Sequence, residues 1–233
     1  MHTATKRFIA LLFAVGASFP AIAEGPMATD DAGTLGVGGI KAEAVLGRDD
    51  KVRSAELGFG YGVIENVELG LVLQRETDRA DDPSAKLRGT GIGIKWVPIQ
   101  NKGDEGGWSF GLSFGYGKAR VNERSTPAKF TEKELSVAGL ATYHFENGQV
   151  LHMNLGSTRV KAQGESVGTW GIGYEFPLME KLQLTVEAFG EEHSGPDKAI
   201  GLRYEIADGL KLYGSFGRGN HRSFGNLGVA WEF

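Results

Sequence analysis

Apolar residues recur at every second position along most of the chain from Gly39 onward. In the run WSFGLSFGYG, residues 108–117, large apolar or aromatic residues alternate strictly with serine and glycine. A period of two is the period of a β-strand, whereas a helix would repeat every three to four residues. The pattern therefore predicts strands throughout this part of the chain.

The other face of these strands is mostly glycine, serine and alanine, with an occasional charge. Glycine is frequent, at 36 of 233 residues. A water-facing strand row normally carries lysine, glutamate and threonine, while glycine suits a curved wall with a crowded or enclosed concave side. Small residues inside and large apolar residues outside indicate a transmembrane β-barrel. A soluble periplasmic β-sandwich is the alternative.

The alternation divides the chain into about twelve strands, an even number as expected for a bacterial barrel. We therefore predict an all-β fold, a single antiparallel transmembrane barrel over residues 39–233. The expected strands cover residues 39–48, 52–62, 67–77, 85–96, 107–118, 131–145, 149–159, 165–176, 182–192, 197–206, 210–218 and 221–233.

The first 23 residues have the form of a signal peptide. Lys6 and Arg7 precede a short apolar run over residues 8–15, and Ala21-Ile22-Ala23 has the small-x-small form of a cleavage site. We expect residues 24–38 to form an N-terminal periplasmic segment. No later stretch has 18 consecutive apolar residues, so the sequence predicts no transmembrane helix.

The connections alternate in length and polarity. Short turns at 64–66, 146–148, 177–181 and 207–209 are expected on the periplasmic side, and 119–130 is expected to be the longest external loop and a candidate constriction. Outward aromatic residues flank the short turns and predict an interfacial girdle. The girdle residues are Tyr61, Trp96, Trp108, Tyr143, Tyr174, Phe176, Tyr204 and Trp231.

The chain ends in an alternating strand whose last residue is Phe233. This ending resembles the C-terminal signal of bacterial outer-membrane proteins, which the barrel assembly machinery reads. The resemblance implies localisation to the bacterial outer membrane. The expected partners are that machinery and the outer-membrane lipids, and we expect a monomer.

Three further stretches carry a second resemblance. They are GPMATDDAGTLG at 25–36, the strand start GIKAE at 39–43 and the turn YGVIENVEL at 61–69. Together with the terminal phenylalanine, they resemble the outer-membrane transporter family associated with phenol meta-cleavage pathways. The resemblance covers most of the mature chain and implies a small barrel that passes hydrophobic or aromatic compounds.

Strand parity places a set of charged residues on the inward face, with six glutamates against four lysines or arginines. They are Lys41, Glu43, Glu56, Glu68, Lys95, Glu175, Glu187, Arg203, Glu205 and Lys211. Twelve strands tilted by about 40° give a backbone diameter of roughly 24 Å. One interpretation is a narrow polar channel for small solutes with slight cation preference. The other is a closed interior in which these groups pair with one another.

An enzymatic alternative rests on His221-Arg222-Ser223 near the external rim, because some small outer-membrane barrels are lipid hydrolases with an outward His-x-Ser pair. No third, orienting residue is visible nearby, so we predict no catalytic residues. His144 and His152 lie inward at one hairpin, but no third ligand is spaced for a metal site. The sequence indicates no cofactor.

Composition excludes several other classes. The chain has no cysteine, which removes disulfide scaffolds, cysteine-ligated metals and thiol catalysis. Its formal charge is −4, without a basic block, so nucleic acid is not an expected partner. The sequence therefore predicts a channel or transporter for small solutes, hydrophobic or aromatic ones included.

Overall fold

The computed structural model describes residues 25–50, 52–78, 85–101, 106–123, 129–161 and 164–233. Its strands are β1 (Ile40–Asp49), β2 (Val52–Ile64), β3 (Val67–Asp78), β4 (Ala85–Ile99), β5 (Gly107–Glu123), β6 (Lys129–His144), β7 (Val150–Val160), β8 (Ser166–Met179), β9 (Leu182–Glu191), β10 (Asp197–Ala207), β11 (Leu210–Gly219) and β12 (Arg222–Glu232).

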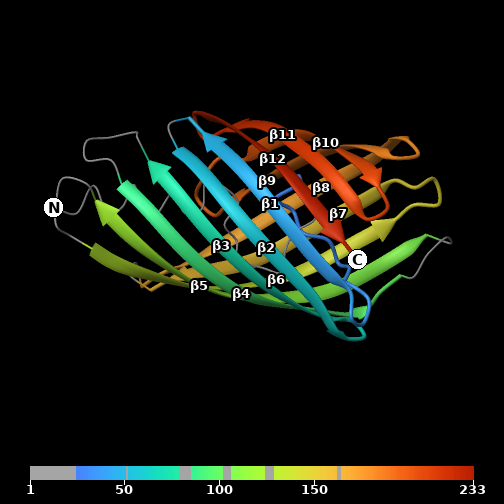
Figure 1. Ribbon diagram of the computed structural model, residues 1–233, viewed down its shortest axis with the longest axis horizontal. Coiled ribbons are helices and arrows are strands. Elements are labelled where there is room, and N and C mark those ends of the chain that lie inside the picture. Colours follow the sequence, from blue (N-terminus) through green and yellow to red (C-terminus); the bar gives the residue numbers. More distant parts are fainter. Residues whose placement is uncertain (1–24, 51, 79–84, 102–105, 124–128, 162–163) are drawn as a thin grey trace.

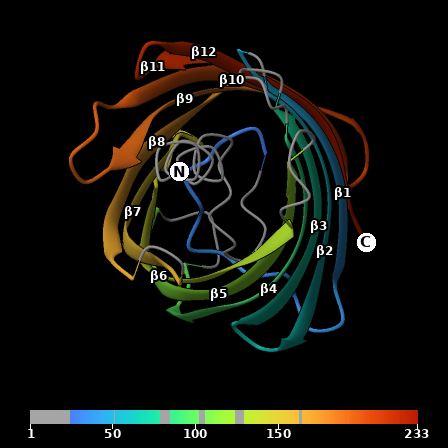
Figure 2. The ribbon, with the colours of Figure 1, turned by 90° about the vertical axis from the view of Figure 1, so that its left-hand side faces the viewer.

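Each strand pairs antiparallel with its neighbours in sequence, and β1 pairs with β12 to close the barrel (Figures 1 and 2). The closing seam runs from Lys41 opposite Glu232 to Asp49 opposite Phe224, and backbone hydrogen bonds join Ile40 to Phe233 in both directions. The all-β twelve-stranded fold is thus confirmed. Closure leaves no open sheet edge, so every strand satisfies its backbone groups on both sides.

The predicted strand limits agree with the structure to within three residues at every end but one. The predicted loop at 119–130 was wrong, because β5 continues through Glu123 and β6 begins at Lys129. The alternation persists there, with Ala119 and Val121 buried inside and packed against Ala85 and Leu87 of β4. These inward apolar contacts extend the β4–β5 pair beyond the strand end that residues 107–118 suggested.

Parity divides the wall as the sequence indicates. On β4, burial alternates strictly from Ala85 to Val97, with inward positions buried and outward positions exposed. The outward positions of the other strands carry most of the exposed large apolar side chains, such as Leu57, Leu71 and Phe114. No helix in the described part of the chain is long and apolar enough to cross a membrane.

An inward aromatic ring joins the last strands to the N-terminal segment. Tyr213 of β11 is 6% exposed, and its hydroxyl donates a hydrogen bond to Glu43 of β1. Its ring lies against Gly228 of β12 and Gly25, where an added Cβ would collide with ring atoms. Only glycine lets the two backbones approach the ring this closely.

We predict that Gly228→Ala lowers the free energy of unfolding by about 1 to 3 kcal/mol, because the new methyl group overpacks the Tyr213 ring. Urea unfolding in detergent measures this. Gly139→Ala, whose added Cβ meets only one atom at 3.8 Å, is the control and should change stability little. Equal midpoints for the two variants would contradict the prediction, whereas Tyr213→Ala should suppress the effect of Gly228→Ala.

Candidate functional site

The inward charged residues predicted from parity lie on the inner face of the barrel wall. Seven of them are buried and three are partly buried. The buried residues are Lys41, Glu43, Glu68, Lys95, Glu175, Glu187 and Arg203, and the partly buried ones are Glu56, Glu205 and Lys211. Whether they line a solute path stays a prediction.

We call residues 25–38 the inner strap: residues 25–35 lie inside the barrel, and the exposed residues 36–38 lead to β1 (Figure 2). From the sequence, this stretch is expected to form an N-terminal periplasmic segment separate from the barrel. The structure instead buries Met27, Thr29, Asp30 and Ala32 against the inner wall. The physical reason is that the strap's backbone, which has no strand partner of its own here, finds hydrogen-bond partners on inward side chains.

Carboxylates and amides of the wall hold the strap backbone. The N–H groups of Ala28 and Thr29 both donate to Glu187 of β9, at 2.9 and 3.0 Å to Oε2. Asp30 and Asn154 of β7 exchange two hydrogen bonds, N–H to Oδ1 at 2.6 Å and Nδ2 to the Asp30 carbonyl at 2.8 Å. A single bound conformation is therefore specified along several residues of the strap.

The other end of the strap crosses to the opposite wall. The Leu35 N–H donates to Glu68 Oε2 of β3 at 3.1 Å, and the Gly38 N–H donates to the Gly62 carbonyl of β2 at 2.8 Å. The strap thus runs from β9 and β10 to β2 and β3 across the interior.

Inward glycines make room for it. An added Cβ at Gly171 or Gly173 of β8 would lie 2.9 Å from Thr29 Oγ1 or 3.1 Å from the Met27 sulfur. At Gly62 of β2 the added Cβ would collide with the strap backbone at Gly36. Several of the small inward residues noted in the sequence are therefore the surface on which the strap rests.

Lys95 of β4 forms the main charged contact with the strap. Its ammonium lies 2.8 Å from Asp30 Oδ1 and 2.8 Å from Asp31 Oδ1, and the Lys95 side chain is 2% exposed. Burial raises the pKa of Asp30 to about 7, although Lys95 opposes the shift. At the more exposed Asp31, desolvation also opposes ionisation, but Lys95 outweighs it and holds the pKa below its usual range. The ammonium is therefore paired with Asp31 at neutral pH.

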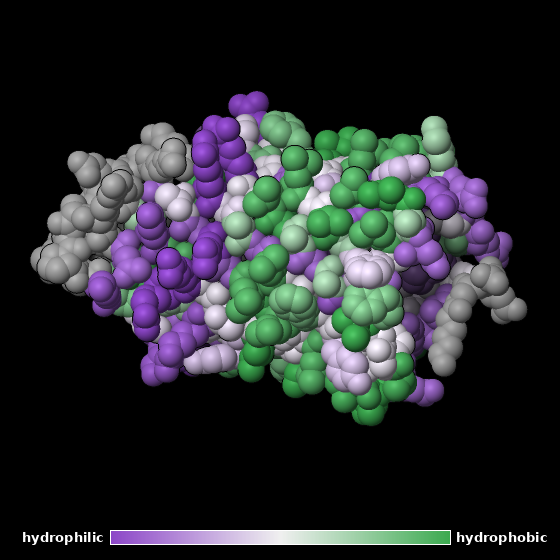
Figure 3. All heavy atoms as spheres, viewed as in Figure 1, coloured by the Kyte–Doolittle hydropathy of each residue, from purple (hydrophilic) through white to green (hydrophobic). Residues whose placement is uncertain are grey.

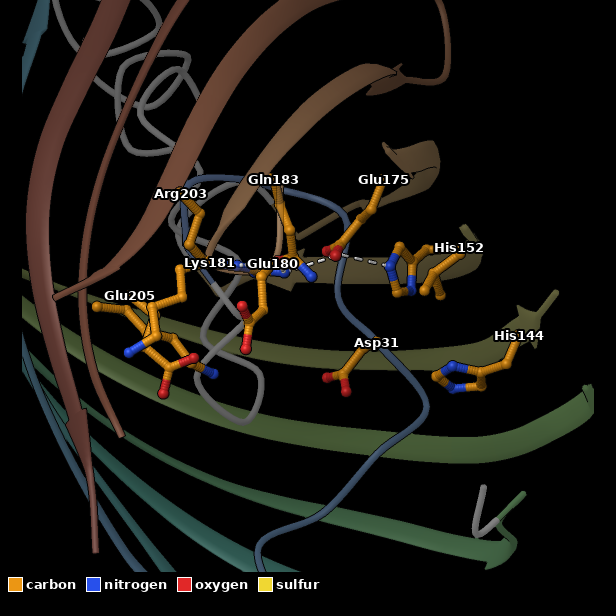
Figure 4. Close-up of a pocket in the computed structure, with 11 residues that line it drawn as sticks. Asp31, His144, His152, Glu175, Glu180, Lys181, Gln183, Arg203 and Glu205 are labelled. Carbon is orange, nitrogen blue, oxygen red and sulfur yellow. Dashed lines mark hydrogen bonds and ion pairs between the residues drawn. The ribbon is translucent and has the colours of Figure 1, made fainter. Parts of the chain in front are cut away.

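A second polar network begins and ends on the strap. The Ala32 N–H donates to Thr142 Oγ1, which lies 3.0 Å from His152 Nδ1, and His152 Nε2 lies 3.4 Å from Glu175 Oε1. Glu175 Oε2 pairs with Arg203 at 2.5 Å, and Arg203 Nη1 donates to the Gly25 carbonyl at 3.0 Å. Strap and wall are thus linked through the interior of the barrel (Figure 4).

Two cavities flank the strap at the end of the barrel that carries the short turns. One, of about 360 Å³, is lined by His144, His152, Glu175, Arg203 and Lys211 among others, with Asp31 projecting from the strap (Figure 4). The other, of about 270 Å³, is lined by strap residues 31–35 together with Lys41, Glu68 and Lys95. Both are lined by charges of both signs, which suits water and small hydrophilic molecules.

The hydrolase pair has no supporting geometry. His221 adopts a left-handed backbone conformation with φ of 62°, and the Ser223 N–H donates to Asp50 Oδ1 at 3.1 Å. Among the described residues, no hydrogen bond joins the His221 and Ser223 side chains. In the same part of the chain, no three histidine, aspartate or glutamate side chains converge as metal ligands.

The predicted girdle residues lie on the outward face near the short turns. The rings of Trp108 and Tyr143 contact each other in a tilted arrangement with centroids 4.9 Å apart, and those of Tyr174 and Phe176 do so with centroids 4.6 Å apart. Phe233 continues the row beside Trp231 at 4.6 Å. Their interfacial role and the assembly role of Phe233 stay predictions.

The sequence missed the strap as part of the lumen. The excess of inward glycine indicated a crowded interior but did not say what fills it. The strap's partners lie far away in the chain, since Ala28 and Glu187 are 159 residues apart. No local pattern of residues reports such a contact.

Comparison with known proteins gives a family and a fold. A family model described as "Uncharacterised conserved protein UCP029691" matches residues 11–229. No curated protein matches the sequence significantly. The family description names no substrate, so the association with phenol meta-cleavage stays a hypothesis.

Solved structures with a similar fold are outer-membrane β-barrels. A KdgM porin in complex with disordered oligogalacturonate has a TM-score of 0.61 and 11% identity, covering 83% of this chain and 99% of the porin. The translocator domain of the autotransporter NalP from Neisseria meningitidis has a TM-score of 0.50 and 17% identity, covering 84% and 90%. Outer-membrane phospholipase A from Escherichia coli has a TM-score of 0.50 and 12% identity, covering 82% and 92%.

We predict that Lys95→Met loosens the strap and lowers the free energy of unfolding by about 3 kcal/mol, because Asp30 and Asp31 lose their shared cation. Urea unfolding in detergent measures the change, and Lys198→Met, at an exposed outward lysine, is the matched control. The triple variant Lys95→Met, Asp30→Asn, Asp31→Asn should recover most of the loss. A Lys95→Met barrel as stable as the Lys198→Met barrel would rule out a structural role for the ion pair.

Proposed function

We propose that the chain, which belongs to the family described as uncharacterised conserved protein UCP029691, forms a passive outer-membrane channel for small hydrophilic solutes. The observation that carries the proposal is the division of the wall, apolar outside and charged inside, with polar cavities on both sides of the strap. The apolar exterior suits a bilayer, and a charged interior suits water and solutes. The likeness to outer-membrane barrels supports the same placement.

In this proposal the inner strap sets the size limit of the pore. A twelve-stranded barrel has an interior of modest width, and a chain segment crossing it divides the remaining space into the two cavities. Passage is then limited to solutes small enough to pass through these cavities. A constriction by residues 119–130, which the sequence suggested as a loop, is not needed for this role.

The charges of the lumen favour cations. Among the described strand residues of the inward face, acidic side chains outnumber basic ones. The acidic ones are Glu43, Asp49, Glu56, Glu68, Glu76, Asp78, Glu132, Glu134, Glu175, Glu187, Glu191, Asp197, Glu205 and Glu232, and the basic ones are Lys41, Lys95, Arg203, Lys211 and Arg222. An acidic pore attracts cations and repels anions.

The acidic lining of the lumen also bears on which class of solute the channel would pass. The similar porin was solved with an oligogalacturonate, an anionic sugar, and an acidic lumen would repel such a ligand. Aromatic or hydrophobic solutes, which the phenol meta-cleavage resemblance implies, would gain nothing from a charged lining. The proposal therefore favours small neutral or cationic hydrophilic solutes over both.

A closed barrel is the competing function, because the strap is held by buried ion pairs and hydrogen bonds at many points. In that reading the strap is a permanent plug that stabilises the fold. Conductance separates the two, since a plugged barrel folds but passes no ions.

We expect the refolded protein to show discrete, small, cation-selective conductance steps in a planar bilayer. Removal of residues 24–35 should raise the conductance severalfold, because the cross-section now occupied by the strap becomes water-filled. Leu155→Ala, at an outward residue with 74% exposure, is the control and should leave the conductance unchanged. Different gel mobility of unheated and boiled samples checks folding of every variant.

The reversal potential in a salt gradient tests the selectivity. Replacing Glu68 and Glu205 with glutamine should shift the reversal potential toward that of a nonselective pore. Silence of both the intact and the shortened barrel would reject the channel, whereas conduction only after shortening would identify the strap as a plug.

A further inference from the structure

The outward faces of the strands carry charges of one sign only. At outward positions of the described strands, every ionised side chain of the lysine, arginine, aspartate and glutamate classes is a lysine or an arginine. They gather at the strand ends remote from the short turns. Figure 3 shows the hydrophilic residues at this end of the front strands, directly beside the apolar band.

The densest part of this surface lies on β3 to β6, and we call it the basic patch. It consists of Arg75, Lys86, Arg88, Lys118, Arg120 and Lys133. Arg75 lies opposite Arg88 in the β3–β4 register, Arg88 lies opposite Arg120 in β4–β5, and Lys118 lies opposite Lys133 in β5–β6.

These cations are exposed and lack acidic partners within the part of the chain that the structure describes. Like charges placed directly opposite each other across a strand pair are destabilising. The carboxylates that alternate with them, such as Glu76, Glu132 and Glu134, lie on the inner face of the wall. They cannot form hydrogen bonds to the patch through the wall.

The position of the patch along the barrel axis indicates what surrounds it. Trp96, in the aromatic row, and Arg88 lie on the same strand eight residues apart. With a rise of about 3.3 Å per residue and a tilt of about 40°, this separation corresponds to roughly 20 Å along the barrel axis. The aromatic row and the patch therefore bound the two sides of an apolar band only slightly shorter than the roughly 25 Å band of outer-membrane barrels. The exposed Leu73 and Ile92 bring that band up to the patch.

A partner for this surface must be anionic and must carry apolar chains beside its charge. Arginine guanidinium groups bind phosphate oxygens through two parallel hydrogen bonds, and basic clusters at a membrane surface attract anionic headgroups. A single phosphodiester charge would leave six cations largely uncompensated. A second copy of the barrel cannot neutralise the patch with its wall, because the described outward strand positions hold no acidic residue.

We propose that the basic patch is a binding site for a lipid headgroup with two or more phosphate groups, in the leaflet facing away from the short turns. The acyl chains of this lipid lie along Leu73, Ile92 and the neighbouring outward residues. The phosphate groups lie over the row from Arg75 to Arg120. This inference requires the barrel to cross a membrane but does not require an open lumen.

The test compares lipids in the folded, detergent-solubilised barrel. The probes are lipid A with two phosphate groups, phosphatidylglycerol with one, and zwitterionic phosphatidylcholine. Native mass spectrometry measures the fraction of barrels that carry one lipid as its concentration rises. The patch predicts that lipid A binds at least about tenfold more tightly than the other two.

Matched variants locate the site. The patch variant Arg75→Gln, Arg88→Gln, Arg120→Gln should lose about tenfold or more of the affinity for lipid A. The control variant Arg53→Gln, Arg159→Gln, Arg218→Gln removes the same charge from three outward positions that do not face one another, and should lose no more than about twofold. Both retain the inner face, so heat-dependent gel mobility should match the parent barrel.

Three results would overturn the proposal. Equal losses in the two variants would mean general surface electrostatics instead of a site. Equal affinity for phosphatidylglycerol would mean that one phosphate suffices, and equal affinity for phosphatidylcholine would mean that the headgroup charge is not read. The conductance of the patch variant should equal that of the parent, so a failed lipid site is distinguishable from a failed channel.

Discussion

The wall of this protein is one residue thick, and strand parity alone decides which of two environments each side chain enters. The strands close into a barrel through the β1–β12 seam, so the strand backbone needs no further hydrogen-bond partner and adds no preference between the two faces. Outward residues over the apolar band must then suit an apolar exterior, and inward polar residues must find polar partners inside. The strap, the cavities and the basic patch are all consequences of this division.

The chain's own N-terminal segment supplies hydrogen-bond and ion-pair partners to the polar residues of the interior. Inward carboxylates such as Glu187 and Glu68 would otherwise face one another or water, and the strap offers them backbone N–H groups. Lys95 lies opposite Glu68 in the β3–β4 register, and Asp30 and Asp31 of the strap supply its ion-pair partners. Because each partner satisfies the other, strap and lumen form one polar unit. A channel function then depends on how much water this unit leaves around it.

The sequence predicted the parts of the fold that depend on local alternation. Strand number, pairing order and most strand ends follow from the period of two, since each strand reveals its own inward and outward faces. The end of β5 was missed because lysine, arginine and asparagine at the outward positions 118, 120 and 122 look like a loop. They continue the alternation, with charge in place of apolar residues, beyond the apolar band.

The strap and the basic patch differ in how far the sequence alone reveals them. The strap has no period, and its wall partners are separated from it by 33 residues at Glu68, 65 at Lys95 and 159 at Glu187, so only a folded wall reveals it. The outward direction of the patch residues follows from strand parity. Only the strand register shows that Arg75, Arg88 and Arg120 lie side by side. At the patch end of these strands acidic residues point inward and basic residues outward, as with Glu76 beside Arg75. Under the two proposals, this arrangement attracts cations to the lumen and anions to the rim, so one alternating pattern serves both surfaces.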